Sequence, residues 1–232
     1  EVPLRRTVAL KLVRAGVDSR DVLKRFERER AALAVLSHDH IAKIFDAGLA
    51  ADGRPYFVLE HVAGEPIDGW CERRGLDVEA RLRLLLQVCD AVQHAHQKGL
   101  VHRDLKPSNV LVSDASGTPT CKIVDFGVAR ALSGELAEET LLTRTGQLLG
   151  TPAYMSPEQA GRGHDVDTRA DVYSLGALLY ELLTGHRPLD LELARATGPA
   201  EIERVLLEVA PRRPSAHRPR LAADLDWITL KA

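Results

Sequence analysis

The sequence predicts an α+β fold in which most strands gather in the first quarter of the chain and helices dominate the rest. Short runs rich in β-branched and aromatic residues at 6–13, 41–45 and 55–62 favour strands. Longer segments at 77–98 and 168–184 repeat their apolar residues at helical spacing. We therefore expect a β-rich first part followed by a mainly helical second part.

A break in the pattern at 63–66 separates these two parts. Its sequence, Ala-Gly-Glu-Pro, contains two residues that interrupt regular structure, and we interpret it as a hinge. On length alone, 232 residues fit one large domain or two small lobes equally well. In the two-lobe interpretation, the small lobe is 1–62 and the large lobe is 67–232.

The first predicted strand carries a lysine among small and apolar residues. Strict alternation divides its side chains between two faces, Val8, Leu10 and Leu12 on one and Ala9, Lys11 and Val13 on the other. Lys11 therefore shares its face with small and apolar neighbours. The alternative is an ordinary edge-strand lysine that faces water.

A helix is predicted over 18–36, beginning at an Asp-Ser pair. Glu29 lies on its apolar stripe, with Phe26 and Leu33 one turn to either side. A carboxylate there faces water at the edge of the stripe or has a buried cationic partner, for which Lys11 is our candidate. The helix is dense in charge, so a solvated Glu29 remains the alternative.

The helix at 77–98 is predicted to bury one stripe of side chains, namely Leu82, Leu85, Leu86, Cys89, Val92 and Ala95. His94 and His96 lie on different faces of it, so we expect ordinary helix histidines and no metal site. Farther along, 202–209 and 224–231 show helical patterns, and 131–149 is a polar stretch without a clear period, typical of a loop.

Composition and charge exclude several function classes. The formal net charge of −2 and pI near 6.6 give no broad attraction to nucleic acid or to an anionic membrane. Cys71, Cys89 and Cys121 are widely spaced without a C-x-x-C pattern, which favours a reduced, cytoplasmic setting. The strongly apolar segment 174–183 is too short to span a bilayer, and we expect no membrane contact within this chain.

The residues that suggest chemistry concentrate at 101–127. One run, Val-His-Arg-Asp-Leu-Lys-Pro-Ser-Asn, ends at Asn109, and another, Lys-Ile-Val-Asp-Phe-Gly, begins at Lys122. Apolar, strand-like runs flank a loop with one carboxylate, one ammonium and one carboxamide, and a second carboxylate, Asp125, follows Asp104 by 21 positions. This set of groups can hold a metal-bound polyphosphate against a hydroxyl.

Six motifs in order carry a resemblance to a known family: V-A-L-K, F-E-R-E, H-R-D-L-K-P-S-N, D-F-G, G-T-P-A-Y-M-S-P-E and D-V-Y-S-L-G. Together they resemble the eukaryotic-type, or Hanks-type, serine/threonine protein kinases, and most closely the bacterial members. The resemblance covers practically the whole chain. It implies a two-lobed protein-kinase-like fold and transfer of the γ-phosphoryl group of ATP, with Mg²⁺ or Mn²⁺, to Ser or Thr hydroxyls of proteins.

The resemblance also assigns roles to single residues. It implies that Lys11 binds the α- and β-phosphates and pairs with Glu29. Asp104 is similar to the family's catalytic base, and Asn109 and Asp125 are similar to its Mg²⁺ ligands. These groups would supply the charge neutralisation and in-line placement that phosphoryl transfer needs.

Further roles concern the acceptor side of the site. Lys106 would reach the same phosphoryl oxygens, and with Ser108 it matches the serine/threonine branch of the family. Thr151 corresponds to a threonine that bonds the catalytic Asp and Lys. Phosphorylation of the loop after D-F-G would give Arg103 an anion to bind. The candidate sites are Thr143 and Thr145, and unmodified loop threonines are the alternative.

An adenine site is implied as well. Ala9 and Leu111 would sandwich the ring, Leu59 would be the gatekeeper, and the backbone from Glu60 to Val62 would supply hinge hydrogen bonds. The alternative is that these are simply apolar core residues. The family's regulatory spine would consist of Leu33, Ile44, His102 and Phe126. Asp171 would hold the backbone at His102 and Arg103.

Two departures from the family pattern concern the ends of the chain. No G-x-G-x-x-G precedes Lys11, and the arginine that usually pairs with Glu158 is missing. We therefore expect an excerpt of a larger kinase, one that binds ATP weakly and phosphorylates poorly by itself. The full-length protein could be membrane-anchored, and the resemblance allows a homodimer for autophosphorylation.

Two other functions stay open from the sequence. A pseudokinase or regulatory binding module would keep the fold without the chemistry, although it would have no need of Lys11, Asp104 or Asp125. A small-molecule kinase of the aminoglycoside or choline type shares the two-lobed plan. The segment 150–158 argues against that second reading, because it resembles a platform for protein substrates. The expected partners are thus ATP and protein substrates, with no nucleic acid.

Overall fold

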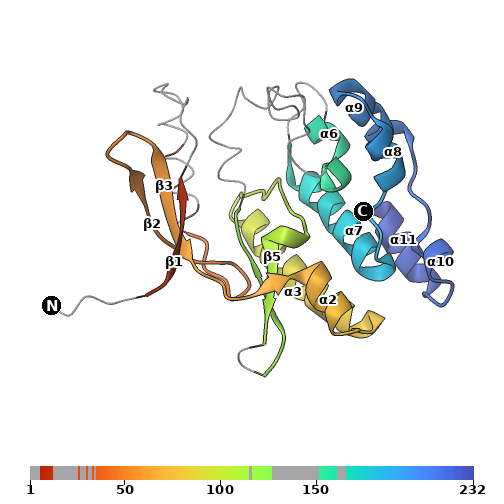
Figure 1. The fold of residues 1–232 in the computed structure, drawn as a ribbon, viewed down its shortest axis with the longest axis horizontal. Coiled ribbons are helices and arrows are strands. Elements are labelled where there is room, and N and C mark those ends of the chain that lie inside the picture. Colours follow the sequence, from red (N-terminus) through yellow and green to blue (C-terminus); the bar gives the residue numbers. More distant parts are fainter. Residues whose placement is uncertain are drawn as a thin grey trace.

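The computed structural model describes residues 6–12, 26, 30, 33, 35–114, 117–126, 152–160 and 166–232. A small sheet-rich part occupies one side of the molecule, and a larger, mainly helical part occupies the other (Figure 1). The predicted α+β class is thereby confirmed. None of the helices in the described ranges is both long and apolar enough to cross a bilayer.

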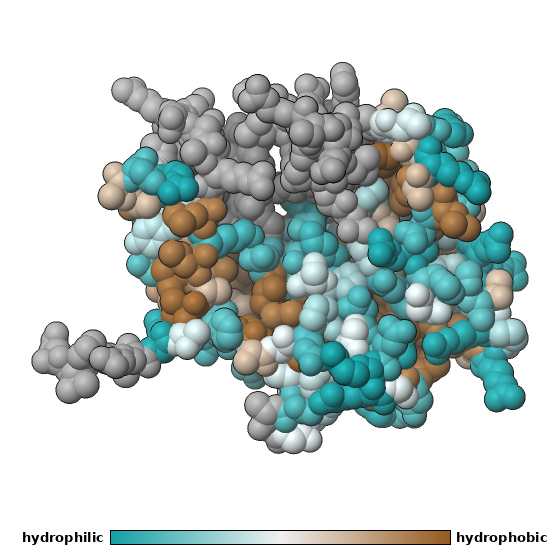
Figure 2. Space-filling model, viewed as in Figure 1, coloured by the Kyte–Doolittle hydropathy of each residue, from teal (hydrophilic) through white to brown (hydrophobic). Residues whose placement is uncertain are grey.

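The first sheet is antiparallel with the strand order β1-β3-β2, where β1 is Val8–Leu12, β2 is Ile44–Leu49 and β3 is Pro55–Glu60. In the register, Lys11 lies opposite Phe57 and Ala9 lies opposite Leu59. The predicted alternation holds, because Leu10 is 60% exposed whereas Lys11 is partly covered. Figure 2 shows apolar side chains gathered over this sheet.

The strand predicted at 41–45 is wrong in its bounds. Ile41 instead forms a parallel bridge with Ile123 in the second sheet, and the Ala42 N–H donates to the Ile123 carbonyl at 2.9 Å. The strand begins only at Ile44, and its register shifts between Ile44 and Asp46. Residues 41 and 42, just before β2, therefore link the first sheet to the second. A run of β-branched residues looks the same in such a link as in a regular strand, so the sequence pattern could not separate the two.

The second sheet has the order β4-β5-β6, where β4 is Glu65–Pro66, β5 is Val110–Ser113 and β6 is Thr120–Ile123. Half of the predicted hinge thus forms a short strand against β5. Val110, at the start of β5, lies opposite Ile123, at the end of β6. Because these strands are antiparallel, the polar loop before β5 and the loop after β6 lie at the same end of the strand pair.

The helical part contains α2 Ile67–Arg73, α3 Val78–Gln97, α6 Pro157–Ala160, α7 Thr168–Thr184, α8 Asp190–Arg195, α9 Pro199–Glu208, α10 Pro214–His217 and α11 Ala223–Lys231, with 3-10 turns η1 Pro107–Asn109 and η2 Pro152–Tyr154. The prediction of a helix at 168–184 is confirmed. The patterns at 202–209 and 224–231 also correspond to helices. Helices α2, α6, α8 and α10 were not predicted.

Helix α7 runs through the centre of the helical part (Figure 1). Leu178, Leu182 and Leu183 are almost fully buried along it, and each contributes roughly 1.5–3 kcal/mol by leaving water. The helix ends at Gly185, whose φ of 78° is left-handed, a conformation that suits glycine. The buried helix gives the functional site a rigid base.

Helix α3 buries most of the predicted stripe, with Leu85, Val92 and Ala95 inside and Leu82 and Cys89 partly buried against the core. One predicted member is wrong. Leu86 was expected inside and is 66% exposed, whereas Arg81 is only 7% exposed. The Arg81 guanidinium donates at 2.8 Å to the Leu76 carbonyl and at 2.8 Å to the Leu182 carbonyl of α7. An arginine with its donors satisfied in this way is stable inside, so the buried face of the helix includes a polar residue that the apolar pattern did not predict.

Candidate active site

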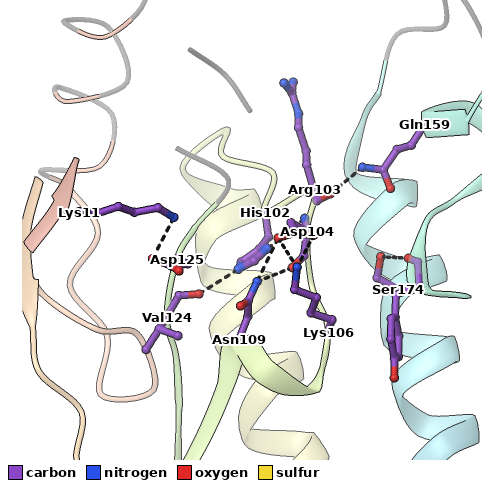
Figure 3. A network of polar contacts seen from close by, with 11 residues as sticks. Lys11, His102, Arg103, Asp104, Lys106, Asn109, Val124, Asp125, Gln159 and Ser174 are labelled. Carbon is purple, nitrogen blue, oxygen red and sulfur yellow. Dashed lines mark hydrogen bonds and ion pairs between the residues drawn. The ribbon is translucent and has the colours of Figure 1, made fainter. Parts of the chain in front are cut away.

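The Asp104 carboxylate lies in the loop before β5 and is held by two neighbouring side chains. The Lys106 ammonium is 2.9 Å and 3.1 Å from its two oxygens. The Asn109 amide nitrogen donates to the Asp104 carbonyl at 2.7 Å and to its carboxylate at 3.2 Å (Figure 3). The side chain that the resemblance proposes as a base is therefore fixed in place.

Asp171 of α7 holds the backbone of this loop from below, as predicted. Its buried carboxylate accepts from the N–H groups of His102 and Arg103, both at 2.8 Å. His96 Nε2 of α3 donates to the same carboxylate at 2.8 Å. Arg103 has a left-handed φ of 65°, which is costly for a residue other than glycine, and these bonds help to impose it.

The second carboxylate, Asp125, follows β6 and meets a residue of the first sheet. Lys11 Nζ lies 3.1 Å from Asp125 Oδ1 (Figure 3). The Val124 N–H donates to the Asn109 carbonyl at 2.9 Å, so the loop after β6 is bonded to the loop before β5. Asp125 also has a left-handed φ, 59°. The four charged or amide residues of the predicted centre therefore converge at the junction of the two sheets.

A pocket opens between the two sheets beside Lys11 and Asp125. Its wall is otherwise apolar and includes Leu59 and Phe57 from β3 and Phe126 from the loop after β6. Leu59, the predicted gatekeeper, thus lies in this pocket. Four predicted adenine-site residues are not part of its lining, namely Ala9, Glu60, Val62 and Leu111. Their contact with a nucleotide stays a prediction.

Glu60 uses its polar groups inside the protein. Its carboxylate lies 2.9 Å from Lys122 Nζ and accepts from the Lys43 N–H at 3.1 Å. Burial acts to raise the pKa of Glu60, but the hydrogen bonds from Lys43 and Lys122 outweigh it and lower the pKa. The Glu60 N–H donates to the Lys43 carbonyl at 2.8 Å. The Glu60 N–H is therefore engaged within the protein, and hinge bonds from the remaining backbone groups of 60–62 stay a prediction.

Two observations bear on the predicted regulatory spine. The rings of His102 and Phe126 lie 4.7 Å apart between centroids. Leu33 and Ile44 line the same pocket as Phe126. Burial lowers the pKa of His102, which favours the neutral ring. Its Nδ1 accepts from the Asp104 N–H at 3.2 Å, so the ring proton lies on Nε2.

Several predicted residues lie outside the described ranges. They are Glu29, Thr143, Thr145 and Thr151. The predicted Lys11–Glu29 pair and the role of Thr151 therefore stay predictions.

The residues present fit a magnesium ion that is shared with a nucleotide. Mg²⁺ in such enzymes takes one or two protein ligands and completes its shell with phosphate oxygens and water. Asn109 and Asp125 could supply the two protein ligands, since it is the Asn109 nitrogen and not its oxygen that bonds to Asp104. In the described ranges no group of three or more His, Cys, Asp or Glu residues could hold a metal alone.

Two residues of the site escaped the sequence analysis. His96 seemed an ordinary helix histidine, yet it contacts Asp171. Gln159 of α6 donates to the Arg103 carbonyl at 2.6 Å (Figure 3). The Ser-x-x-Gln spacing of Ser156 and Gln159 is a helix-start signal that could have drawn attention to Gln159. Nothing in the sequence signals the contact of His96.

Comparison with known proteins decides the family. The model of the protein kinase domain matches residues 3–221. The chain belongs to the protein kinase family. It is 37% identical to the serine/threonine-protein kinase PknB of Mycobacterium leprae, over 100% of this chain and 36% of that protein. It is 38% identical to the serine/threonine-protein kinase Pkn1 of Myxococcus xanthus, over 97% of this chain and 31% of that one.

Solved structures agree with this membership. The crystal structure of the PknI kinase domain of Mycobacterium tuberculosis superimposes with a TM-score of 0.68 at 30% identity, covering 96% of this chain and 75% of that one. The resemblance stated from the motifs, including its bacterial character, is thereby confirmed. This kinase-family chain spans about a third of the length of the curated relatives named above.

Proposed function

We propose that this kinase-family chain carries the catalytic centre of a protein serine/threonine kinase that transfers the γ-phosphoryl group of ATP. The observation that supports this most is that the charged and amide side chains of the site converge at the junction of the two sheets. Lys11 from the first sheet lies 3.1 Å from Asp125 after the second sheet, and the Asp104–Asn109 loop is bonded to the strand end that carries Asp125. A protein that does not transfer phosphoryl groups has no need to bring a lysine, an asparagine and two aspartates together at one end of the sheets.

The Asp104 carboxylate is assigned to the acceptor. Lys106 and Asn109 hold it in one orientation, so it can accept a hydrogen bond from an incoming hydroxyl and receive its proton as transfer proceeds. Because Lys106 lies against this carboxylate, its ammonium can neutralise charge on the phosphoryl oxygens at the same point.

Lys11 and Asp125 are assigned to the nucleotide. Their side chains are 32% and 39% exposed, so both can exchange their mutual contact for ligand atoms. We infer that Lys11 binds the α- and β-phosphates and pairs with Glu29, and that Asp125 and Asn109 hold Mg²⁺. A magnesium ion held by these two residues would supply neutralisation of the phosphate charge.

Protein substrates are favoured by the segment 152–160. It comprises η2 and α6, and it packs on α7 through a 2.8 Å bond from the buried Ser174 hydroxyl to the Tyr154 carbonyl. The same segment reaches the catalytic loop through Gln159. A rigid surface beside the acceptor position suits an extended polypeptide that carries Ser or Thr.

The test is transfer of label from γ-labelled ATP to a general protein substrate, measured with the protein in its natural full length. Asp104→Asn should lower the rate by roughly 10²–10⁴-fold, because the substitution removes the base and keeps the shape. ATP binding should change little. An unchanged rate in Asp104→Asn, or no transfer by the unmodified protein, would refute the proposal.

A further inference from the structure

We propose that Gln159 is a positioning residue that couples the segment 152–160 to the orientation of Asp104. The inference rests on the proposed function, because it assigns Asp104 to catalysis. Figure 3 shows the Gln159 side chain reaching from α6 toward the catalytic loop, where its Nε2 donates to the Arg103 carbonyl at 2.6 Å. This direct side-chain bond crosses from the substrate-side segment to the residue before the proposed base.

The other end of the Gln159 amide has a separate task. Its Oε1 accepts from the Ser156 N–H at 3.1 Å and from the Ser156 hydroxyl at 3.3 Å. Ser156 is fully buried and directly precedes α6, so this is the return half of a helix capping box. Glutamine and glutamate serve this half equally, because only an acceptor oxygen is needed.

The donor half is what distinguishes glutamine at this position. An ionised glutamate has no N–H, so it can close the capping box and cannot donate to the Arg103 carbonyl. The side chain therefore performs one task that either residue could perform and one that only glutamine can. A mutation can separate the two.

The Arg103 carbonyl is a sensitive point in the loop. It belongs to the same rigid peptide plane as the Asp104 N–H. Gln159 holds one end of this plane, and His102 Nδ1 accepts from the other end at 3.2 Å. Arg103 itself has a left-handed φ, and on its other side its own N–H donates to Asp171 at 2.8 Å. Release of the carbonyl frees the plane to rotate, and the Asp104 carboxylate moves with it.

The decisive variant is Gln159→Glu in the full-length protein. It should keep the thermal midpoint near that of the unmodified protein and lower kcat by roughly 10- to 100-fold, as expected for a misplaced catalytic group. The KM for ATP should change by less than about twofold, since Lys11 and Asp125 are not touched. An unchanged kcat, or a loss confined to KM, would overturn the proposal.

A pH series distinguishes positioning from a general structural effect. When the carboxyl introduced by Gln159→Glu is protonated, it regains an O–H donor for the Arg103 carbonyl. The ratio of variant to unmodified kcat should therefore rise as the pH falls from 8 to 5.5. A ratio that stays flat or falls would contradict the role of the donor.

The matched control is Gln87→Glu in α3. Gln87 makes the same kind of double contact, accepting from the Cys121 N–H at 2.8 Å and donating to the Pro119 carbonyl at 3.2 Å, away from the catalytic loop. The Gln87→Glu substitution should leave kcat unchanged. An equal loss of kcat in this control would assign the effect to lost stability and overturn the proposal.

Amide hydrogen exchange tests the link without any catalysis. Exchange at the Asp104 N–H should be at least about fivefold faster in Gln159→Glu than in the unmodified protein, because the peptide plane opens locally. If the protein transfers no phosphate, the proposed function fails, and this exchange still decides whether Gln159 holds the loop. Identical exchange would overturn the link itself.

Discussion

Lys11 and Asp125 form an ion pair of 3.1 Å between a strand of the first sheet and the loop that follows the second. Each side chain is about a third exposed, so the pair stabilises the fold by less than about 1 kcal/mol. Lys11→Met should therefore leave the free energy of unfolding nearly unchanged. Phosphoryl transfer should fall by at least about 100-fold, because the ammonium proposed to neutralise phosphate charge is gone.

Urea unfolding and a transfer assay on the same preparation measure the two effects of Lys11→Met. The control is Arg83→Met, which breaks an exposed ion pair of 2.5 Å with Glu79 outside the proposed site. It should change neither quantity appreciably. A large loss of stability in Lys11→Met, with activity falling in proportion, would mean that Lys11 is structural.

Asp171 is expected to be a major determinant of stability. Asp171→Ala leaves one buried and one partly buried backbone N–H, as well as His96, without their acceptor, at a cost of roughly 3–5 kcal/mol. Asp167→Ala, in the exposed N-cap of the same helix, should cost only about 1 kcal/mol. Equilibrium unfolding in urea measures the loss of unfolding free energy in each of the two variants. Equal costs would show that the loop does not depend on Asp171.

His102 should make the protein less stable in mild acid. Burial lowers the pKa of this histidine in the folded state below its usual value of 6.5. The unfolded chain then binds the proton more readily, so stability is present above pH 6.5 and is lost as the pH falls through the folded-state pKa. His102→Phe should show a smaller decrease in unfolding free energy between pH 7 and pH 5. An equally steep decrease would assign the acid sensitivity to other groups.

The buried cysteines should be unreactive in the folded protein. Burial raises the pKa of the Cys71 thiol to about 11 and that of the Cys121 thiol to about 12, and both residues are fully covered. Iodoacetamide at pH 8 should label neither one natively and both in urea, as read by mass spectrometry. Native labelling at the denatured rate would show that these positions are open to solvent.

The sequence was most informative where one local pattern determines the structure. Helix α7 matches its predicted bounds, because its interior is apolar almost all round and Gly185 can adopt the left-handed C-cap. The convergence of Lys11 and Asp125 was also predicted, although it was carried by the family's motifs rather than by periodicity. The order and spacing of several motifs together constrain a site far more than any single motif does.

Tertiary contacts explain what the sequence could not show. Arg81 is buried because carbonyls from other elements accept its donors, and no local pattern reports those carbonyls. The contacts of His96 with Asp171 and of Gln159 with Arg103 join segments that are remote in sequence. Ile41 pairs with the second sheet for the same reason, which displaced the predicted strand.

The most direct test of a shared nucleotide and metal site is calorimetric titration of ATP into the full-length protein, with and without Mg²⁺. We predict that Mg²⁺ raises the affinity of the unmodified protein by at least about tenfold and that Asp125→Asn abolishes this gain, because the substitution removes a proposed ligand of the ion. Asp114→Asn, an exposed acid that pairs with Arg74, should retain the full gain. Mg²⁺-independent binding, or an undiminished gain in Asp125→Asn, would contradict the assignment of this site.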